Sequence, residues 1–179
     1  MTDEELVRQL MNPETRRAAF EVMVKQYSEP LYWKIRHIVV NHEDADDILQ
    51  NVFMKAWSNM GTFENRSKLS TWLYRIAVNQ CLDFLRKQNN NPQISAEEVR
   101  GLSSRLLADE YFDGDELQAK LRAVVASLPD AQRIIFNMRY FDDMKYKDIA
   151  LALNRSEGTI KASYHIAVQK IVDFFHKHD

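Results

Sequence analysis

Apolar residues recur at three- and four-residue steps along most of this chain, a period that predicts amphipathic helices. The segment 70–87, STWLYRIAVNQCLDFLRK, shows the pattern clearly. On a helical projection its apolar arc contains Leu69, Leu73, Ile76, Ala77, Cys81 and Phe84. The opposite side carries a polar stripe made of Trp72, Arg75, Asn79, Asp83 and Arg86. The arc is expected to be buried and the polar stripe to remain accessible.

The same periodicity divides the rest of the chain into two helical domains. Before the 70–87 helix we expect helices over the first forty residues, with a new start at Ser28-Glu29-Pro30, and a helix over 41–57. The sequence QNNNPQIS, which begins at residue 88, cannot continue a helix. The predicted fold is therefore all-α: a domain over 1–90, a flexible linker over 91–115 with short helical turns and no packed core, and a domain over 116–179.

The second domain carries the pattern of a helix-turn-helix. Pro129 opens a helix over 129–141, a short helix covers 146–153, and Asn154-Arg155 makes a tight turn. Ser156 then caps a longer helix that runs through Phe175. Its outward positions are Gly158, Lys161, Ala162, His165, Ile166 and Gln169, where a major-groove reader presents side chains. Many helix pairs share this pattern without touching DNA.

Composition restricts the possible classes of protein. The 179 residues are 45% hydrophobic and 28% charged, with a net charge of −2 and a single cysteine. One cysteine excludes an internal disulfide framework and is typical of a reducing cytosol, so we predict a cytoplasmic protein. No apolar run is long enough to span a bilayer, which predicts no membrane insertion. The modest charge argues against a module that binds naked DNA strongly by itself.

Two groups of residues suggest chemistry, and each has a plainer explanation. The polar stripe combines a ring for stacking, cations for phosphate and an amide for base edges, which suits single-stranded nucleic acid. Trp and Arg on a helix are also typical of a core aromatic beside a solvated face. The carboxylates Glu43, Asp44, Asp46 and Asp47 could hold a metal, but no His or Cys joins them at ligand spacing, and acidic groups commonly cap a helix. We predict no metal and no cofactor.

Four segments in order carry a resemblance to a known family. They are DADDILQNVFMKAW (44–57), STWLYRIAVNQCLDFLRK (70–87), LPDAQRIIFNMRYF (128–141) and YKDIALALNRSEGTIKASYHIAVQKI (146–171). Together they resemble the bacterial extracytoplasmic-function RNA polymerase sigma factors of the sigma-70 family. The resemblance implies a sigma region 2 bundle, a linker and a sigma region 4 helix-turn-helix.

The resemblance implies a role for each surface of the first domain. The helix over 44–57 corresponds to the segment that docks on the β′ clamp helices of core RNA polymerase. Its candidate contacts are Asp44, Asp47, Gln50, Asn51 and Met54. The loop that follows and the polar stripe correspond to the surface that recognises and melts the promoter −10 element. There an unstacked base would enter a pocket, with Phe63 forming its wall and Asn79 donating a hydrogen bond to the base. The candidates there are Phe63, Arg66, Lys68, Trp72, Arg75, Asn79 and Arg86.

The last helix corresponds to the reader of the promoter −35 element. The candidates are Arg155, Ser156, Gly158, Thr159, Lys161, Ala162, Ser163, His165, Ile166 and Gln169. Many family members carry arginines in this helix where this chain has Ser163, Ile166 and Val168. Arginine to guanine is the commonest specific base contact, so we expect a different balance of contacts here, with Lys161, His165, backbone groups and DNA shape contributing.

We therefore predict a sigma factor with no chemistry of its own, which directs promoter-specific initiation by RNA polymerase. Its implied partners are core polymerase through the β′ clamp helices and β flap, promoter DNA, and an anti-sigma factor; the free protein is expected to be a monomer. The main alternative is an autonomous helix-turn-helix repressor or activator that binds duplex DNA without polymerase. A hydrolase using the Glu43–Asp47 carboxylates lacks a nucleophile, a base and an orienting group.

Overall fold

The computed structural model describes residues 1–88, 95–110 and 112–178, and this part of the chain is helical without strands. The chain divides into two compact units, Met1–Phe84 and Leu85–Asp179. The prediction of an all-α fold with two helical domains is confirmed. The predicted end of the first domain at residue 90 and the start of the linker at 91 lie outside the described residues.

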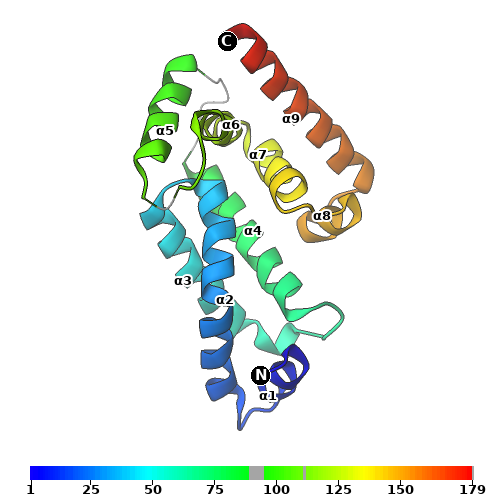
Figure 1. Ribbon diagram of the computed structural model, residues 1–179. Coiled ribbons are helices and arrows are strands. Elements are labelled where there is room, and N and C mark those ends of the chain that lie inside the picture. Colours follow the sequence, from blue (N-terminus) through cyan, green and yellow to red (C-terminus); the bar gives the residue numbers. More distant parts are fainter. Residues whose placement is uncertain (89–94, 111, 179) are drawn as a thin grey trace. The chain divides into compact units, whose positions relative to one another are not determined.

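The first unit is a bundle built around the long helix α2 (Figure 1). Its elements are α1 (Asp3–Met11), α2 (Arg16–Val39), α3 (His42–Ser58), the 3-10 turn η1 (Met60–Thr62) and α4 (Leu69–Lys87), whose last residues pass into the second unit. Thr2 caps α1 by accepting a hydrogen bond from the Glu5 amide at 3.2 Å. The rings of Phe20 on α2 and Trp57 on α3 meet edge to face at 5.0 Å.

Helix α2 runs without interruption through Pro30, so the prediction of a new helix start there is wrong. A proline inside a helix removes one hydrogen bond and costs about 3 kcal/mol. Leu31, Ile35 and Ile38 are nonetheless buried on the same helix as Ala19 and Met23. Each buried aliphatic side chain contributes roughly 1.5–3 kcal/mol, so one continuous apolar face outweighs the local defect.

The buried side of α4 is broader than the predicted arc. Leu69, Leu73, Ala77 and Cys81 are buried as expected, whereas Ile76 and Phe84 are only half-buried. Burial extends instead to a second row made of Tyr74, Val78, Leu82 and Leu85. Lys34 on α2 places its Nζ 4.4 Å from the Tyr74 ring centroid, a cation–π contact across the two helices. The helix therefore presents only a narrow exposed strip.

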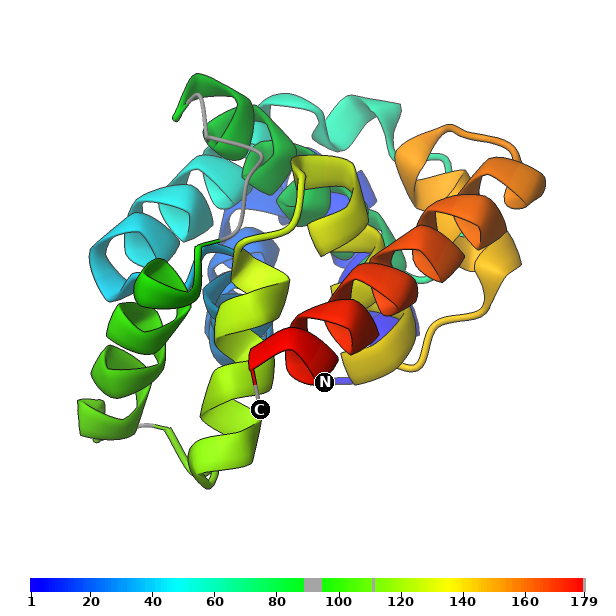
Figure 2. The same ribbon diagram turned by 90° about the horizontal axis from the view of Figure 1, so that it is seen from above.

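The second unit packs its helices around the long C-terminal helix. Its elements are α5 (Ala96–Ala108), α6 (Glu116–Ala126), α7 (Asp130–Phe136), the π-helical turn η2 (Asn137–Phe141), α8 (Tyr146–Leu153) and α9 (Glu157–His178). Figure 2 shows α5 beside α6, and α8 at the N-terminal end of α9. Helix α9 also packs against α7 and α6.

Helix α5 overturns the prediction that the stretch between the domains does not pack. Ser95 caps the helix by accepting the Glu98 amide at 3.0 Å. Val99 is 1% exposed and joins a core with Val124, Val125 and Phe174. On this mostly polar helix only Val99 and Leu106 are buried and Leu102 is half-buried, and so sparse an apolar face looks like a linker in the sequence alone.

The predicted helix over 129–141 forms in two parts. Pro129 precedes α7, and from Asn137 the backbone changes to a π-helical turn that ends where the Asp142 amide donates to the Asn137 carbonyl at 3.0 Å. The Arg122 guanidinium lies 3.4 Å from the Phe141 ring centroid. Burial lowers the pKa of Arg122 to about 10, and the nearby Asp142 carboxylate opposes that shift. The π-helical turn thus ends with the Phe141 ring against the partly buried Arg122 guanidinium.

Within the described ranges, none of the helices combines the length and the apolar character needed to cross a membrane.

Packing of α5 predicts a measurable contribution to the second unit. Val99→Ala should lower the free energy of unfolding by about 2 kcal/mol, because it removes buried methyl groups and leaves a cavity. Urea unfolding of the full chain measures the loss, and amide hydrogen exchange assigns it to α5, α6 and α9. Leu107→Ala on the same helix is the control, since that side chain is 44% exposed and should cost less than half as much. Equal small effects of both variants would mean that α5 does not anchor to this core.

Candidate nucleic-acid and polymerase surfaces

The loop between η1 and α4 tucks one aromatic ring inward. Phe63 is 5% exposed, and its ring centroid lies 5.1 Å from that of Trp72 at a tilt of 54°. Asn65, two residues after this ring, adopts a left-handed backbone with φ 56°. Phe63 is therefore a support beneath Trp72 in this structure, and its side chain is not open to solvent.

The polar stripe lies on the accessible side of α4. Trp72 and Arg75 are half-buried, while Asn79, Asp83 and Arg86 are exposed. The Asn79 amide nitrogen donates to the Arg75 carbonyl at 2.9 Å, which leaves its carbonyl oxygen directed away from the helix backbone. The buried Nε of Arg75 has no hydrogen-bond acceptor among the described residues. An indole, cations and an amide thus share one strip of helix.

Two further basic candidates stand at the entrance of α4. Arg66 and Lys68 are both exposed. Arg66 makes a surface ion pair with Glu64, with Nε 3.0 Å from Oε2, and its side chain is 85% exposed. Such an exposed pair stabilises by no more than about 1 kcal/mol, so Arg66 is easily released to another anion. Of the predicted −10 residues, the structure therefore brings Phe63 of the loop against Trp72 of α4, with Phe63 below the surface.

The outward face of α3 presents the residues predicted to contact polymerase. Asn41 caps the helix by accepting the Asp44 amide at 3.1 Å. Along the exposed side lies a docking face made of Asp44, Asp47, Gln50, Asn51 and Met54, of which Asp44 is half-buried. Met54 is 67% exposed. An open depression of about 410 Å³ adjoins this face, lined by Asn51, Met54, Lys55, Ser58, Asn59 and Gln80.

The predicted helix-turn-helix is present in α8 and α9. Asn154 ends α8 in the left-handed conformation, with φ 54° and ψ 50°. The Arg155 amide then donates to the Ala150 carbonyl at 3.0 Å. Ser156 caps α9 by accepting the Thr159 amide at 3.1 Å. The turn has the geometry that its residues predicted, with Arg155 and Ser156 exposed at the corner.

One face of α9 remains open along its first three turns. Ile160, Ala167, Ile171 and Phe174 are buried. The residues predicted to face outward are all exposed and define a reading face, made of Gly158, Lys161, Ala162, His165, Ile166 and Gln169. Thr159 is also exposed, whereas Ser163 is half-buried at the edge of this face.

Tyr164 faces inward on α9, as helical periodicity predicts, but its contact with Tyr146 was not predicted. The Tyr146 ring meets that of Tyr164 at 6.0 Å, and the Arg139 guanidinium lies 4.7 Å from the Tyr146 centroid. Burial raises the pKa of Tyr164, so its phenol stays neutral well above neutral pH. Tyr146 opens α8 and Tyr164 lies inward on α9. Their contact holds the N-terminal end of α8 against α9, a pairing that helical periodicity alone does not reveal.

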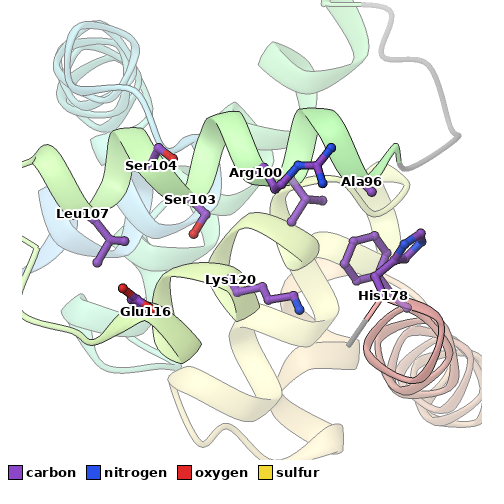
Figure 3. A pocket seen from close by; sticks show the side chains of 10 residues that line it. Ala96, Arg100, Ser103, Ser104, Leu107, Glu116, Lys120 and His178 are labelled. Atoms are coloured by element: carbon purple, nitrogen blue, oxygen red, sulfur yellow. The ribbon is translucent and has the colours of Figure 1, made fainter.

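A groove of about 450 Å³ lies in the second unit between α5, α6 and the end of α9 (Figure 3). Its lining includes Arg100, Lys120, Glu116 and His178 around the buried Val99. None of the site residues predicted from the sequence lines it, because its α5 wall was interpreted as linker. Across the described part of the chain, His, Cys, Asp and Glu form no group that could hold a metal ion.

Comparison with known proteins identifies the family. The Sigma-70 region 2 model matches residues 23–91, and the Sigma-70 region 4 model matches residues 118–171. The ECF RNA polymerase sigma factor SigW of Bacillus subtilis is 32% identical over 156 residues, which cover 82% of this chain and 83% of that protein. The ECF RNA polymerase sigma-E factor of Escherichia coli K12 is 28% identical over 171 residues, 90% of this chain and 88% of that protein.

This chain belongs to the extracytoplasmic-function sigma factors of the sigma-70 family, which direct promoter-specific initiation by RNA polymerase. The predicted family is confirmed, and the alternative of an autonomous repressor or activator is not supported.

Solved structures share the fold. CnrH, in complex with the cytosolic domain of CnrY, superimposes with a TM-score of 0.68 at 20% identity over 99% of both chains. RpoE of Bartonella quintana, in complex with the anti-sigma factor NepR, gives 0.63 at 22% identity over 89% of this chain and 98% of that one.

The position of Phe63 predicts a structural role that a surface residue would not have. Phe63→Ala should lower the free energy of unfolding by about 3–4 kcal/mol, because a buried aromatic ring is deleted. Urea unfolding of the full chain measures the change, and Trp72 fluorescence should shift toward that of an exposed indole. Arg66→Ala in the same loop is the matched control and should change stability by less than about 0.5 kcal/mol. An unchanged unfolding midpoint for Phe63→Ala would contradict the structural role and favour a surface role for Phe63 in binding.

Proposed function

We propose that this chain assembles with core RNA polymerase, opens promoters at the −10 element with its first unit and reads the −35 element with its second. One observation carries the proposal: a single chain exposes both an aromatic, cationic and amide strip on α4 and a capped recognition helix, α9. The first is suited to unstacked bases and the second to duplex DNA. A promoter that is being melted offers both.

The proposed polymerase contact is the docking face of α3. Its two carboxylates and two amides complement a basic and polar partner helix, and the exposed Met54 supplies an adaptable apolar contact at the C-terminal end of the face. The adjoining depression beside Gln80 gives that partner a place to seat a side chain. On core polymerase we assign this partner to the β′ clamp helices, while the second unit contacts the β flap.

The proposed −10 surface is the polar stripe with Arg66 and Lys68. Cations at the helix entrance attract the phosphates of the separated strand, and the accessible face of Trp72 stacks on a base. The Asn79 carbonyl oxygen then accepts a hydrogen bond from a base edge, since its amide nitrogen already donates to Arg75. Phe63 contributes from below, by holding the Trp72 ring. Capture of a flipped base offsets an unstacking cost of a few kcal/mol.

The proposed −35 surface is the reading face of α9 together with the corner that precedes it. Arg155 and Ser156 lie where a motif of this kind meets the DNA backbone, and the exposed first turns of α9 enter the major groove. The residues that we propose to contact the −35 element are Arg155, Ser156, Gly158, Thr159, Lys161, Ala162, Ser163, His165, Ile166 and Gln169.

The net charge of −2 is compatible with a protein whose two units each bind DNA weakly and depend on polymerase for most of the affinity. Polymerase holds both units over one promoter, so two weak readers gain from effective concentration. Phosphodiester bond formation belongs to the polymerase, and we assign no catalysis to this chain. Its place of action is the cytoplasm, where it is a monomer until it meets polymerase. An anti-sigma factor that covers the polymerase-facing surfaces is the proposed regulator.

Transcription with purified core polymerase separates the two functions of the first unit. The Asp47→Ala/Gln50→Ala variant should bind core polymerase about tenfold more weakly, because it removes polar contacts at the centre of the interface. At saturating concentration its open complexes should form normally. Asn79→Ala should bind polymerase normally and open promoters about tenfold more slowly, equivalent to about 1.4 kcal/mol for one lost base contact. Fluorescence anisotropy measures binding, and permanganate footprinting with run-off transcription measures opening.

Glu21→Ala/Lys25→Ala supplies the matched control, since both residues are exposed and lie one turn apart on α2. It should alter neither binding nor opening. Tight binding of promoter duplex by the protein alone, with no initiation on adding core polymerase, would contradict the proposed function. A normal opening rate for Asn79→Ala would remove Asn79 from the −10 surface.

A further inference from the structure

Three polar side chains on or beside the reading face of α9, Thr159, Lys161 and Gln169, contact other residues of the same segment. The Thr159 hydroxyl lies 2.7 Å from that of Ser156, and Lys161 Nζ lies 3.6 Å from Glu157 Oε1. The Gln169 amide donates to Asp173 at 3.0 Å. These three side chains already have partners, and each must exchange one before it reads a base, whereas His165 on the same face is exposed.

Two apolar side chains occupy the middle of the same face. Ala162 and Ile166 are exposed, Ile166 to 46%, and they lie one helical turn apart. The first three turns of α9, EGTIKASYHIAV, contain no arginine, so the commonest guanine contact is missing. An exposed isoleucine on a recognition helix has no role in the core, which Ile160, Ala167 and Ile171 already supply.

We infer that Ala162 and Ile166 read the −35 element by apolar contact with thymine C5-methyl groups, so that this chain selects A·T pairs at the centre of that element. In the major groove only thymine presents a methyl group, and alanine and other apolar side chains are its matching contacts. Residues four apart rise about 6 Å along a helix, and base pairs are spaced about 3.4 Å apart. Two methyl groups one or two pairs apart are thus within reach. This inference rests on the proposed function of α9.

Replacing thymine by deoxyuridine removes only the methyl group and leaves base pairing intact. The holoenzyme, made of full-length chain and core polymerase, is first used to select from duplexes with randomised −35 and −10 windows. Selected −35 duplexes are then synthesised with deoxyuridine at each thymine in turn. We expect about fourfold weaker holoenzyme binding at two positions, the equivalent of about 0.8 kcal/mol for each buried methyl group.

Ile166→Ala should abolish the deoxyuridine effect at one of these positions and keep it at the other. Val172→Ala is the matched control, because Val172 is an exposed apolar residue of α9 outside the reading face. It should retain both effects. Circular dichroism should show the same helix content for both variants.

Selected −35 windows without thymine, or binding that no deoxyuridine substitution weakens, would overturn the inference while transcription initiation persists. An unchanged deoxyuridine profile for Ile166→Ala would remove Ile166 from the contact. Failure of the holoenzyme to select any duplex is a different result, since it would contradict the proposed function itself.

Discussion

Burial of one side of α4 is the constraint on which the functional surface of the first unit depends. Two rows of side chains, from Leu69 to Leu85, are removed from water, and each large aliphatic group contributes roughly 1.5–3 kcal/mol. Rotation of the helix would expose them, so the direction of the opposite side is set by the core. Trp72 and Asn79 lie on that side, and Asn79 is further held by the hydrogen bond that its amide nitrogen donates to the Arg75 carbonyl. The buried ring of Phe63 adds a local support beneath the indole.

In the second unit, burial of one side of α9 likewise sets the direction in which the opposite side of that helix faces. Ile160, Ala167 and Ile171 bury one side of α9, and the Ser156 cap with the left-handed Asn154 determines where the helix begins. Start and rotation together decide which residues meet a groove. The aromatic contact between Tyr146 and Tyr164 holds the other end of α8, away from this turn, to α9. A rigid corner allows recognition by small apolar contacts, which gain little energy each and lose it when misplaced by an ångström.

Local signals in the sequence were sufficient wherever the deciding interaction spans only a few residues. The cap at Ser156, the left-handed Asn154 and the bounds of α8 depend on neighbours within about one turn, and all were predicted. Pro30 and α5 show the limit. The continuity of α2 depends on apolar partners elsewhere in the first unit, and α5 is attached by Val99 to residues of α6 and α9. In both cases the contacting residues lie far away in the sequence, so the local pattern around Pro30 or Val99 does not reveal them.

By itself, the sequence determined the helical class, the two-domain order and the outward residues of α9, because periodicity and capping residues express them directly, while the family followed from the resemblance of four segments. Only the tertiary structure decided that Phe63 lies beneath Trp72 and that Ile76 and Phe84 are half-buried. These are matters of which side chain reaches which neighbour. A helical projection gives a direction for each residue, whereas burial and hydrogen bonding depend on what the rest of the fold places in that direction.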